Sequence, residues 1–459
     1  MLRVRTRALA AGLGVLLVPA IVFAHTVLRK SEPADGAVLH EAPRVIRLTF
    51  SEPPQLAFTR VELVGPDSQP VAVSPLRTAA PDSARIIVAD VVGPLVAGRH
   101  RILWQITSAD GHPVRGTIAF RIAEDATGLV AMSAAIAADT SPPTAVTQPI
   151  AAQTEFGVDS WPYALIRLTG FAAIIVIVGA VVFALIVAPA THHRAPDLDA
   201  AVVADSRRLS AKTGLIATIV LAVAVAARLA AQSYAVSGTA PNAEFVTNVV
   251  RTPWGLGFVL HALAVVVLLV AFARARTARW RLAALTNVLL AVGTALSGHA
   301  AGSGRWTVMA VVSDSVHILA AGGWLGALLL ILVAGVPATA RMEPLGRGLA
   351  LRGMVHAFSP MALAFAGALA LTGIIAAVLH VGTWSALTGS DYGRILLIKI
   401  AGLLLVLAAG AYNWLRLRPA LDADRVGTLR RTAGVELLLA FAVLVVTAWL
   451  VATPTPASR

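Results

Sequence analysis

The chain has 459 residues, enough for two or three globular domains in an ordinary soluble protein. Its composition excludes that class, because 57% of the residues are hydrophobic, only 13% are charged, and the mean hydropathy is +0.78. A water-soluble core cannot hide so much apolar surface, so most of the chain is expected to lie in a lipid bilayer. The absence of cysteine excludes disulfides, zinc–thiolate sites and iron–sulfur clusters.

Residues 1–24 have the pattern of a secretory signal peptide. Three arginines within the first seven residues form a basic region, an apolar run covers 8–23, and Val22-Phe23-Ala24 supplies a cleavage site of small residues. The apolar run is short for a membrane span, so we favour cleavage over an uncleaved anchor helix. The mature chain is then expected to begin at His25.

Residues 25–124 have the pattern of a small all-β sandwich. Alternating or β-branched apolar runs lie at 45–50, 59–64, 86–92, 99–106 and 117–122. Turn signals such as Asp110-Gly111 separate these runs, and no segment has a convincing helical period. About seven short strands in this length are typical of a sandwich. Residues 125–157 are rich in Ala, Thr and Pro and are expected to form a flexible linker.

The rest of the chain is predicted to be an all-α membrane domain, over residues 158–453, followed by a short tail at 454–459. Eight apolar segments have the length of a transmembrane helix. They cover residues 161–188, 212–235, 254–273, 281–301, 306–334, 356–380, 392–416 and 431–452.

Positive charges between these segments indicate the orientation. The loops after the first, third, fifth and seventh segments are rich in Arg and Lys, whereas the alternate loops contain at most one. Under the positive-inside rule the first set is cytoplasmic, so the β-sandwich is extracytoplasmic and the protein is a multi-pass plasma (inner) membrane protein. The formal net charge of +13 is thus a topology signal, and we do not expect nucleic acid as a partner.

The β-sandwich contains residue types that suit a metal ion. A mature N-terminal His25 offers its α-amine and its imidazole in one chelate ring, and an α-amine with a pKa of about 7.7–8.0 can deprotonate near neutral pH. Asp110 and His112 lie two residues apart at a turn, so both can face one ion. Three nitrogens and one oxygen suit Cu(II). Taken alone, the turn could equally be a plain hairpin with a surface histidine. The position of His25 at the predicted cleavage point favours the metal site over this alternative.

Residues 25–122 resemble the CopC family of periplasmic copper-binding proteins. The matching features are His25, Pro33-Ala34-Asp35-Gly36, the run from Leu48 to Pro53, Trp104, and the run from Ser108 to Gly116. The resemblance implies an Ig- or cupredoxin-like sandwich in which His25, Asp110 and His112 bind Cu(II). Some CopC proteins have a Met-rich Cu(I) site, but this chain has no methionine between Met1 and Met132, which implies a Cu(II)-only domain. His40 and His100 match no ligand of the family and are expected to be surface or strand residues.

Most of residues 160–450 resemble CopD, the polytopic partner of CopC, so the order of domains resembles a natural CopC–CopD fusion of the YcnJ type. The motifs that carry this second resemblance are less diagnostic. They are Ser297-Gly298-His299-Ala300, Asp314 with His317, Trp324-Leu325-Gly326, Thr372-Gly373, Tyr392-Gly393-Arg394, Lys399 and Asn413.

Four histidines are expected in the outer half of the membrane domain, namely His261, His299, His317 and His380. Asp314 and His317 share one helix face, and ionisable groups at that depth usually mark a pathway or an ion pair. We favour metal contact over a packing role for His299 and His317. For His261 and His380 the two interpretations are equally favoured. His299 at the mouth, with Asp314 and His317 below it, would form a relay for copper.

Other polar and small residues of the spans have open roles. Arg228, Lys399 and Glu436 also lie within predicted spans. Arg228 or Lys399 could either neutralise Asp314 or extend its own charged group to the outer surface. The cluster Gly322-Gly323-Trp324-Leu325-Gly326 is expected to permit close helix packing rather than to bind a ligand.

Three functions remain compatible with these patterns: copper uptake, copper sequestration or resistance without translocation, and a membrane redox protein that holds haem or reduces copper. We favour uptake, by a transport protein rather than an enzyme. The sequence contains no Cys-Pro-Cys, Asp-Lys-Thr-Gly-Thr or Walker motif, so transport would draw on a gradient or on copper binding downstream. A periplasmic or cytoplasmic copper chaperone is a conceivable partner, and the oligomeric state and the direction of transport stay open.

Overall fold

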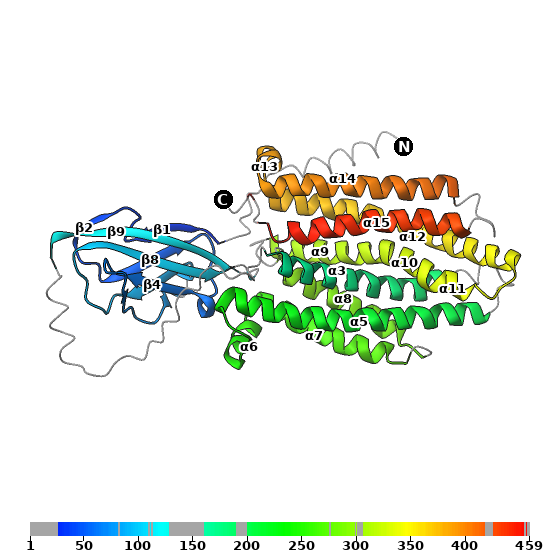
Figure 1. Ribbon diagram of the computed structural model, residues 1–459, viewed down its shortest axis with the longest axis horizontal. Coiled ribbons are helices and arrows are strands. Elements are labelled where there is room, and N and C mark those ends of the chain that lie inside the picture. Colours follow the sequence, from blue (N-terminus) through cyan, green and yellow to red (C-terminus); the bar gives the residue numbers. More distant parts are fainter. Residues whose placement is uncertain are drawn as a thin grey trace, which may run out of the picture.

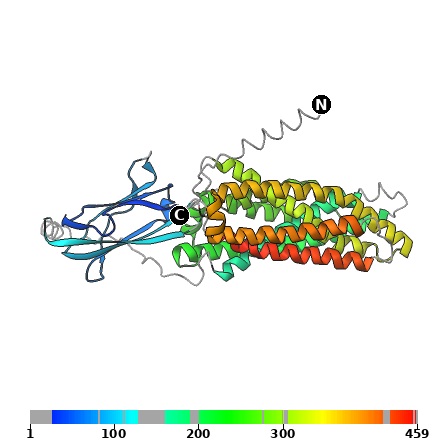
Figure 2. The ribbon, with the colours of Figure 1, turned by 90° about the horizontal axis from the view of Figure 1, so that it is seen from above.

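The computed structural model describes residues 26–80, 83–108, 111, 113–127, 160–189, 200–274, 277–298, 300, 306–417, 426–453 and 456. A β-sheet domain is followed by a helical domain, and the two lie end to end (Figures 1 and 2). The predicted signal peptide and the predicted ligands His25, Asp110, His112 and His299 lie outside the described residues.

Two sheets packed face to face form the β-domain. One has the order β1 (Leu28–Glu32), β3 (Val45–Phe50), β7 (Ile86–Asp90) and β6 (Arg77–Thr78). The other has the order β2 (Val38–Glu41), β9 (Pro113–Thr127), β8 (Gly98–Thr107), β4 (Arg60–Val64) and β5 (Pro70–Val71). Neighbouring strands run antiparallel except β2 and β9, which are parallel.

The core between the sheets follows from the alternation in the sequence. Ile46, Leu48 and Phe50 alternate along β3 and are buried, and Ile102 and Ile106 do the same on β8. The strands predicted at 45–50, 59–64, 86–92, 99–106 and 117–122 are confirmed, with shifts of a few residues at their ends. A 3₁₀ turn, η2 (Leu56–Phe58), interrupts the strands between β3 and β4.

The helical domain is a bundle of long helices with two short helices at the end that faces the β-domain (Figure 1). The long elements are α3 (Trp161–Val182) with η5 (Phe183–Val187), α5 (Ala200–Ser237), α7 (Pro253–Phe272), α8 (Trp280–Leu296), α9 (Thr307–Ala321) continuing through η8 (Gly322–Gly326), α10 (Ala327–Leu330), η9 (Ile331–Gly335) and α11 (Val336–Ala338), then α12 (Pro344–Val381), α14 (Asp391–Tyr412) with η10 (Asn413–Leu417), and α15 (Val426–Leu450). The short helices are α6 (Ala243–Val250) and α13 (Trp384–Gly389).

Seven helices of the described chain are long and apolar enough to cross a membrane. The segment predicted at 281–301 forms α8, an apolar helix of 17 residues that ends before Ser297, so the predicted count of eight spans is not confirmed by length. The second and sixth predicted spans extend well beyond the apolar segments, because α5 and α12 have 38 residues each. Their additional turns carry the charged residues that precede each apolar stretch.

Close helix packing depends on glycines around η8, one of the π-helical segments. A Cβ atom on Gly179 of α3 would collide with the backbone of Gly326, and one on Gly322 would collide with Val178. The expectation that this glycine cluster allows close helix packing is therefore confirmed.

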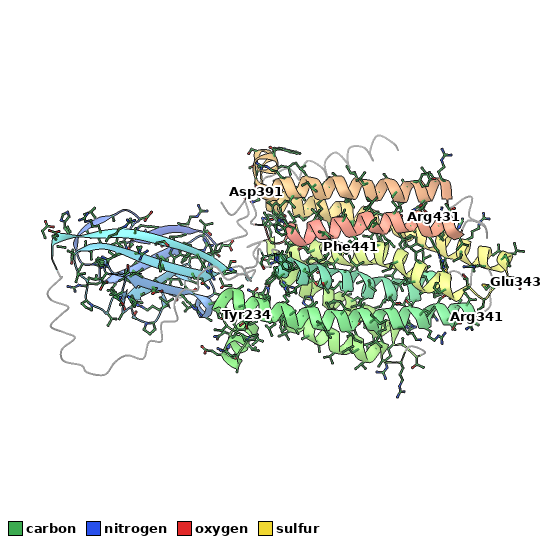
Figure 3. The ribbon with its side chains drawn as sticks, in the orientation of Figure 1. Tyr234, Arg341, Glu343, Asp391, Arg431 and Phe441 are labelled. Atoms are coloured by element: carbon green, nitrogen blue, oxygen red, sulfur yellow. The ribbon has the colours of Figure 1, made fainter. Side chains whose placement is uncertain are left out.

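Charged side chains distinguish the two ends of the bundle. Arg341, Glu343 and Arg431 lie at the end far from the β-domain, whereas Tyr234 and Asp391 lie at the end that faces it (Figure 3). Arg341 and Arg431, which belong to the regions predicted to be cytoplasmic, thus lie at the opposite end of the bundle from the β-domain (Figure 3).

Candidate metal centre

The turn that contains the predicted ligands joins β8 to β9 at the end of the sandwich nearest the helices. The strands stop at Thr107 and resume at Pro113, which leaves a short connection. The Gly111 amide donates to the Ser108 carbonyl at 3.0 Å, and Gly111 has a φ of +86°, a conformation that favours glycine. The side chain of Gln55 donates to the Ser108 carbonyl at 2.7 Å and so supports the turn from the neighbouring segment.

The N-terminal strand is tied to the same end. The Val27 amide donates to the Ser51 hydroxyl at 2.9 Å, and the Ser51 amide donates to the Val27 carbonyl at 2.8 Å. Ser51 begins the segment that leads to Gln55, whose amide donates to the Thr107 carbonyl at 2.9 Å. One short segment therefore holds both the strand that follows His25 and the turn between β8 and β9.

Two buried hydroxyls flank this region. Thr26 and Thr107 are 1% and 2% exposed, and their Oγ1 atoms have no hydrogen-bond partner among the described residues. Buried hydroxyls usually face a protein partner, a water or an ion. These two buried polar atoms lie close in sequence to the predicted ligands.

The turn is in direct contact with the helical domain. The Nε2 atom of Gln232 on α5 donates to the Gly111 carbonyl at 2.6 Å. A Cβ atom on Gly111 would lie 2.7 Å from Cδ1 of Trp254 on α7, so only a glycine fits against this indole. Gly111 in the β8–β9 turn therefore rests against the ends of α5 and α7 that face the β-domain.

A second contact caps the C-terminus of α5. Gln105 donates to the Val236 carbonyl at 2.8 Å, and Arg115 donates to the Ala235 carbonyl at 3.2 Å and to the Gln105 side chain at 2.9 Å. The last carbonyls of a helix lack helical partners and carry partial negative charge. The β-domain thus supplies both the hydrogen bonds and the positive charge that the end of α5 needs.

The junction leaves little empty space. A cavity of about 10 Å³ remains at the contact, room for one water. It is lined by residues of both domains, including Gln55, Phe58, Gly111, Gln232, Phe245 and Trp254. The contact between the turn and the helices is therefore closely packed.

A larger cavity of about 30 Å³ lies on the other side of Trp254, between α3, α5, α7 and α8. Arg167, Arg228 and His261 line it. Arg228 donates to the Ser297 carbonyl at 2.6 Å, and its guanidinium lies 5.5 Å from the Trp254 ring. Two guanidinium groups make this space unfavourable for a cation.

The ring of His261 bridges α7 and α8 beside this cavity. Its Nδ1 donates to the Gly257 carbonyl at 3.0 Å, and its Nε2 lies 3.0 Å from the hydroxyl of Thr294. Both ring nitrogens of His261 therefore have a polar contact within the protein. These contacts join α7 to α8.

His317 on α9 has a different arrangement. The hydroxyl of Thr372 on α12 lies 2.7 Å from the Ala368 carbonyl and 2.9 Å from Nδ1 of His317; when it donates to Ala368, Nδ1–H of His317 donates to Thr372. Nε2 then keeps its lone pair, the form in which imidazole binds a metal. A partner on the other ring nitrogen that fixes the ring in this way is the usual support of a metal-binding histidine.

Charged and aromatic groups surround His317. Asp314, one turn earlier on α9, lies within electrostatic reach of Lys399 on α14. Tyr392 is buried on the same helix as Lys399, and the ring of His380 lies 6.4 Å from the Tyr392 ring. These residues of α9, α12 and α14 form the outer polar cluster, defined as Asp314, His317, Thr372, His380, Tyr392 and Lys399.

Comparison with known proteins covers both domains. The family model for the CopC domain matches residues 28–123, that for the copper resistance protein D-like N-terminal domain matches 157–309, and that for copper resistance protein D matches 352–450. The chain is 32% identical over 112 residues to copper resistance protein C of Pseudomonas syringae pv. tomato, which covers 23% of this chain and 87% of that protein. The chain is a CopC–CopD fusion.

One relative matches almost the whole of this chain. The chain is 25% identical over 457 residues to copper transport protein CutJ of Bacillus subtilis, covering 96% of this chain and 76% of that protein. Among solved structures it is similar to PcoC, a methionine-rich copper resistance protein from Escherichia coli, with 32% identity, 21% of this chain and 98% of that chain covered, and a TM-score of 0.19. The CopC domain of this chain has no methionine at all.

The structure brings only some of the candidate residues of the CopD domain together. His317, Asp314 and His380 belong to the outer polar cluster, whereas His261 lies in a different part of the bundle. Among the described residues, no three His, Asp or Glu side chains are grouped closely enough to hold a metal ion. His40 is exposed and lies 3.2 Å from Asp125, and His100 is buried in β8 against Phe120, as expected for surface and strand residues.

Several residues that position the site were not predicted from the sequence. Gln232 and Trp254 hold the turn of the CopC domain, Gln105 and Arg115 cap α5, and Thr372 orients His317. A signal did exist for Gln232 and Thr372, since each is a polar residue within a long apolar segment. Their partners could not be read from spacing, because each contact joins distant parts of the chain.

Proposed function

We propose that the CopC domain captures Cu(II) outside the cell and passes it to the CopD domain for uptake. The ligands in this proposal are His25, Asp110 and His112. The observation that carries the proposal is the docking of the turn between β8 and β9, because Gly111 stands between Asp110 and His112 and its carbonyl is held by Gln232. A domain that only sequesters copper has no need to hold its binding turn against a membrane domain.

The proposed orientation rests on charge. The arginine-rich end of the bundle faces the cytoplasm under the positive-inside rule, so the opposite end, where the CopC domain docks, faces outward. With α8 counted as a short eighth span, the chain crosses the plasma membrane eight times. The CopC domain then meets copper before the CopD domain does.

The proposed receiving site is His317 with Asp314, in the outer polar cluster. His317 presents an imidazole nitrogen whose lone pair is not used by Thr372. Asp314 supplies a carboxylate one turn away, next to Lys399. The arginines of the cavity beside His261 disfavour that route, so we place copper passage on the α9, α12 and α14 side, with His299 as the first contact.

Copper uptake into vesicles tests the proposal. Proteoliposomes with the CopC domain outward should accumulate chelator-resistant copper faster than protein-free liposomes. Gln232→Leu should slow this accumulation severalfold while leaving Cu(II) binding intact, because it removes the bond that holds the turn. The matched control is Asn287→Leu, which removes another buried amide, on α8, that takes no part in docking.

The alternatives predict other results. Sequestration predicts Cu(II) bound outside and no copper inside the vesicles with wild-type protein. A haem protein would show a haem absorption spectrum on purification. Normal uptake by Gln232→Leu would remove docking from the mechanism.

A further inference from the structure

A second buried carboxylate lies within the CopD domain, apart from Asp314 of the outer polar cluster. Glu436 of α15 is 3% exposed, and its two oxygens accept hydrogen bonds from two other helical segments. Trp324 donates from its indole nitrogen to Oε1 at 3.1 Å, and Asn413 donates from Nδ2 to Oε2 at 2.8 Å. Both partners lie in π-helical segments, η8 and η10, and such segments are frequent at functional sites.

Within the part of the chain that the structure describes, no cation neutralises this carboxylate. Among the described residues Glu436 makes no ion pair, and its polar contacts are the two neutral donors. Arg430 and Arg431 on its own helix and Arg416 beyond Asn413 are exposed. Lys399 on α14 interacts with Asp314 and not with Glu436.

The other charged groups on the helices that pack around Glu436 belong to other parts of the bundle. On the run that begins with α9, Asp314 and His317 belong to the outer polar cluster, and on α3 Arg167 stands over the ring of Tyr163. An unpaired carboxylate inside a membrane domain is costly, so such groups usually have a function.

The side chain of Asn413 can serve both protonation states of Glu436. As observed, Nδ2–H donates to an ionised carboxylate, and the amide oxygen Oδ1 is buried without a partner among the described residues. If Glu436 binds a proton, half a turn of the amide lets the new O–H donate to Oδ1. The bond from Trp324 to the other oxygen is unchanged by this rotation.

There is also space for the amide of Asn413 to rotate and for the carboxyl group of Glu436 to change its protonation state. Gly410 stands beside the carboxylate, and a Cβ atom there would lie 3.3 Å from Oε1 of Glu436 and 3.6 Å from the Trp324 ring. A side chain at this position would crowd both groups. The glycine leaves room for the carboxyl and the indole to adjust.

The site shares its supporting helices with the outer polar cluster. Trp324 follows His317 by seven residues, two helical turns or about 10 Å along the same helical run. Asn413 follows Lys399 by fourteen residues on the α14 run, which returns to nearly the same helix face. A structural change at Glu436 or at the outer polar cluster can therefore be transmitted to the other site through these two continuous helical runs.

We propose that Glu436 is a proton-binding site, and that it exchanges its proton when copper passes the outer polar cluster. Proton binding stands independently of transport, whereas the exchange rests on the copper uptake proposed above. Asn413 rotates with the exchange, and Trp324 keeps the carboxyl group in place. The ligand is the proton, and its outward movement would balance part of the charge that copper carries inward.

Infrared difference spectroscopy of the full chain in liposomes tests proton binding directly. A pH change should produce the C=O band of a protonated carboxylic acid, and Glu436→Gln should remove that band. Asn413→Leu should shift the band, because the protonated carboxyl loses its acceptor, while Asn287→Leu should leave it unchanged. A band that survives Glu436→Gln, or that is the same in Asn413→Leu, would overturn the assignment.

Proton movement during copper uptake tests the exchange. In vesicles with a pH dye inside, wild-type copper uptake should be accompanied by proton release to the outside, and Glu436→Gln should abolish that release. Copper uptake without proton movement in wild type, or unchanged movement in Glu436→Gln, would refute the exchange. An absence of copper uptake in wild type would instead contradict the proposed transport and leave the infrared result standing.

Discussion

The hydroxyl of Tyr163 on α3 donates to Oε1 of Gln232 on α5 at 2.7 Å. This bond fixes the orientation of the amide, so that Nε2 of Gln232 points to the Gly111 carbonyl. Three segments far apart in sequence are thereby joined at the point where the CopC domain meets the membrane domain. The docked position depends on polar contacts as well as on the packing of Phe58 against Phe245.

The Gln232 bond is expected to stabilise the docked arrangement. Gln232→Leu leaves the Gly111 carbonyl without its partner, at a cost of about 1–3 kcal/mol, which favours undocking about 5- to 150-fold. Hydrogen–deuterium exchange should become faster at the end of α5 and in α6. Tyr163→Phe should have a smaller effect, and unchanged exchange in Gln232→Leu would show that this bond does not hold the domain.

The free α-amine of His25 is expected to be a copper ligand. Insertion of one alanine between Ala24 and His25 removes that amine from the chelate ring without altering the β-strands. Cu(II) affinity of the full chain, measured by competition with a chelator, should fall at least as much as for His112→Ala, by about 10- to 100-fold or more. If the extended chain bound Cu(II) as tightly as the original, the amine would not be a ligand.

Thr372 is expected to act through His317. Thr372→Val keeps the shape of the side chain but removes the acceptor for His317 Nδ1–H, so the ring loses its fixed orientation. Passage of copper should fall by about 10- to 100-fold, as for other supports of metal ligands, with Cu(II) capture unchanged. Thr447→Val, which removes a hydroxyl bonded only within α15, is the control and should pass copper normally.

Acid should weaken the CopC domain through His100. Burial lowers the pKa of His100, so the folded domain resists protonation of a ring that is stacked on Phe120. The unfolded chain takes up that proton below a pKa of about 6.5, so the contribution of His100 is complete above this pH and declines as the pH falls below it.

Thermal unfolding at pH 7.5 and pH 5.5 should reveal this decline. His100→Phe should narrow the difference in Tm between the two pH values, whereas His40→Gln, at an exposed position, should leave it unchanged. An equal difference in wild type and His100→Phe would mean that another group causes the acid sensitivity.

The strands and the buried face of the CopC domain follow from local patterns. Ile46, Leu48 and Phe50 alternate in the sequence and are buried in the structure. The contacts between domains could not be predicted in this way, because Gln105 and Val236 are 131 residues apart and meet only after both domains have folded. The surroundings of His261 could not be predicted for the same reason, since the contact of its Nε2 atom with Thr294 comes from a different helix, α8.

The pairing of Trp324 and Asn413 with Glu436 also lay beyond sequence patterns. Each of the three stood out as a polar or aromatic residue in an apolar segment. Spacing along one helix says nothing about which of them face each other, because they come from three separate helical runs.

The central claim is that copper is captured by one domain and passes through the other. The most direct measurement follows bound and internal copper together in vesicles that carry wild-type protein, His112→Ala or His317→Ala. Wild type should bind Cu(II) outside and accumulate copper inside, His112→Ala should lose both, and His317→Ala should bind Cu(II) outside and accumulate none. Normal accumulation by His317→Ala would contradict the account.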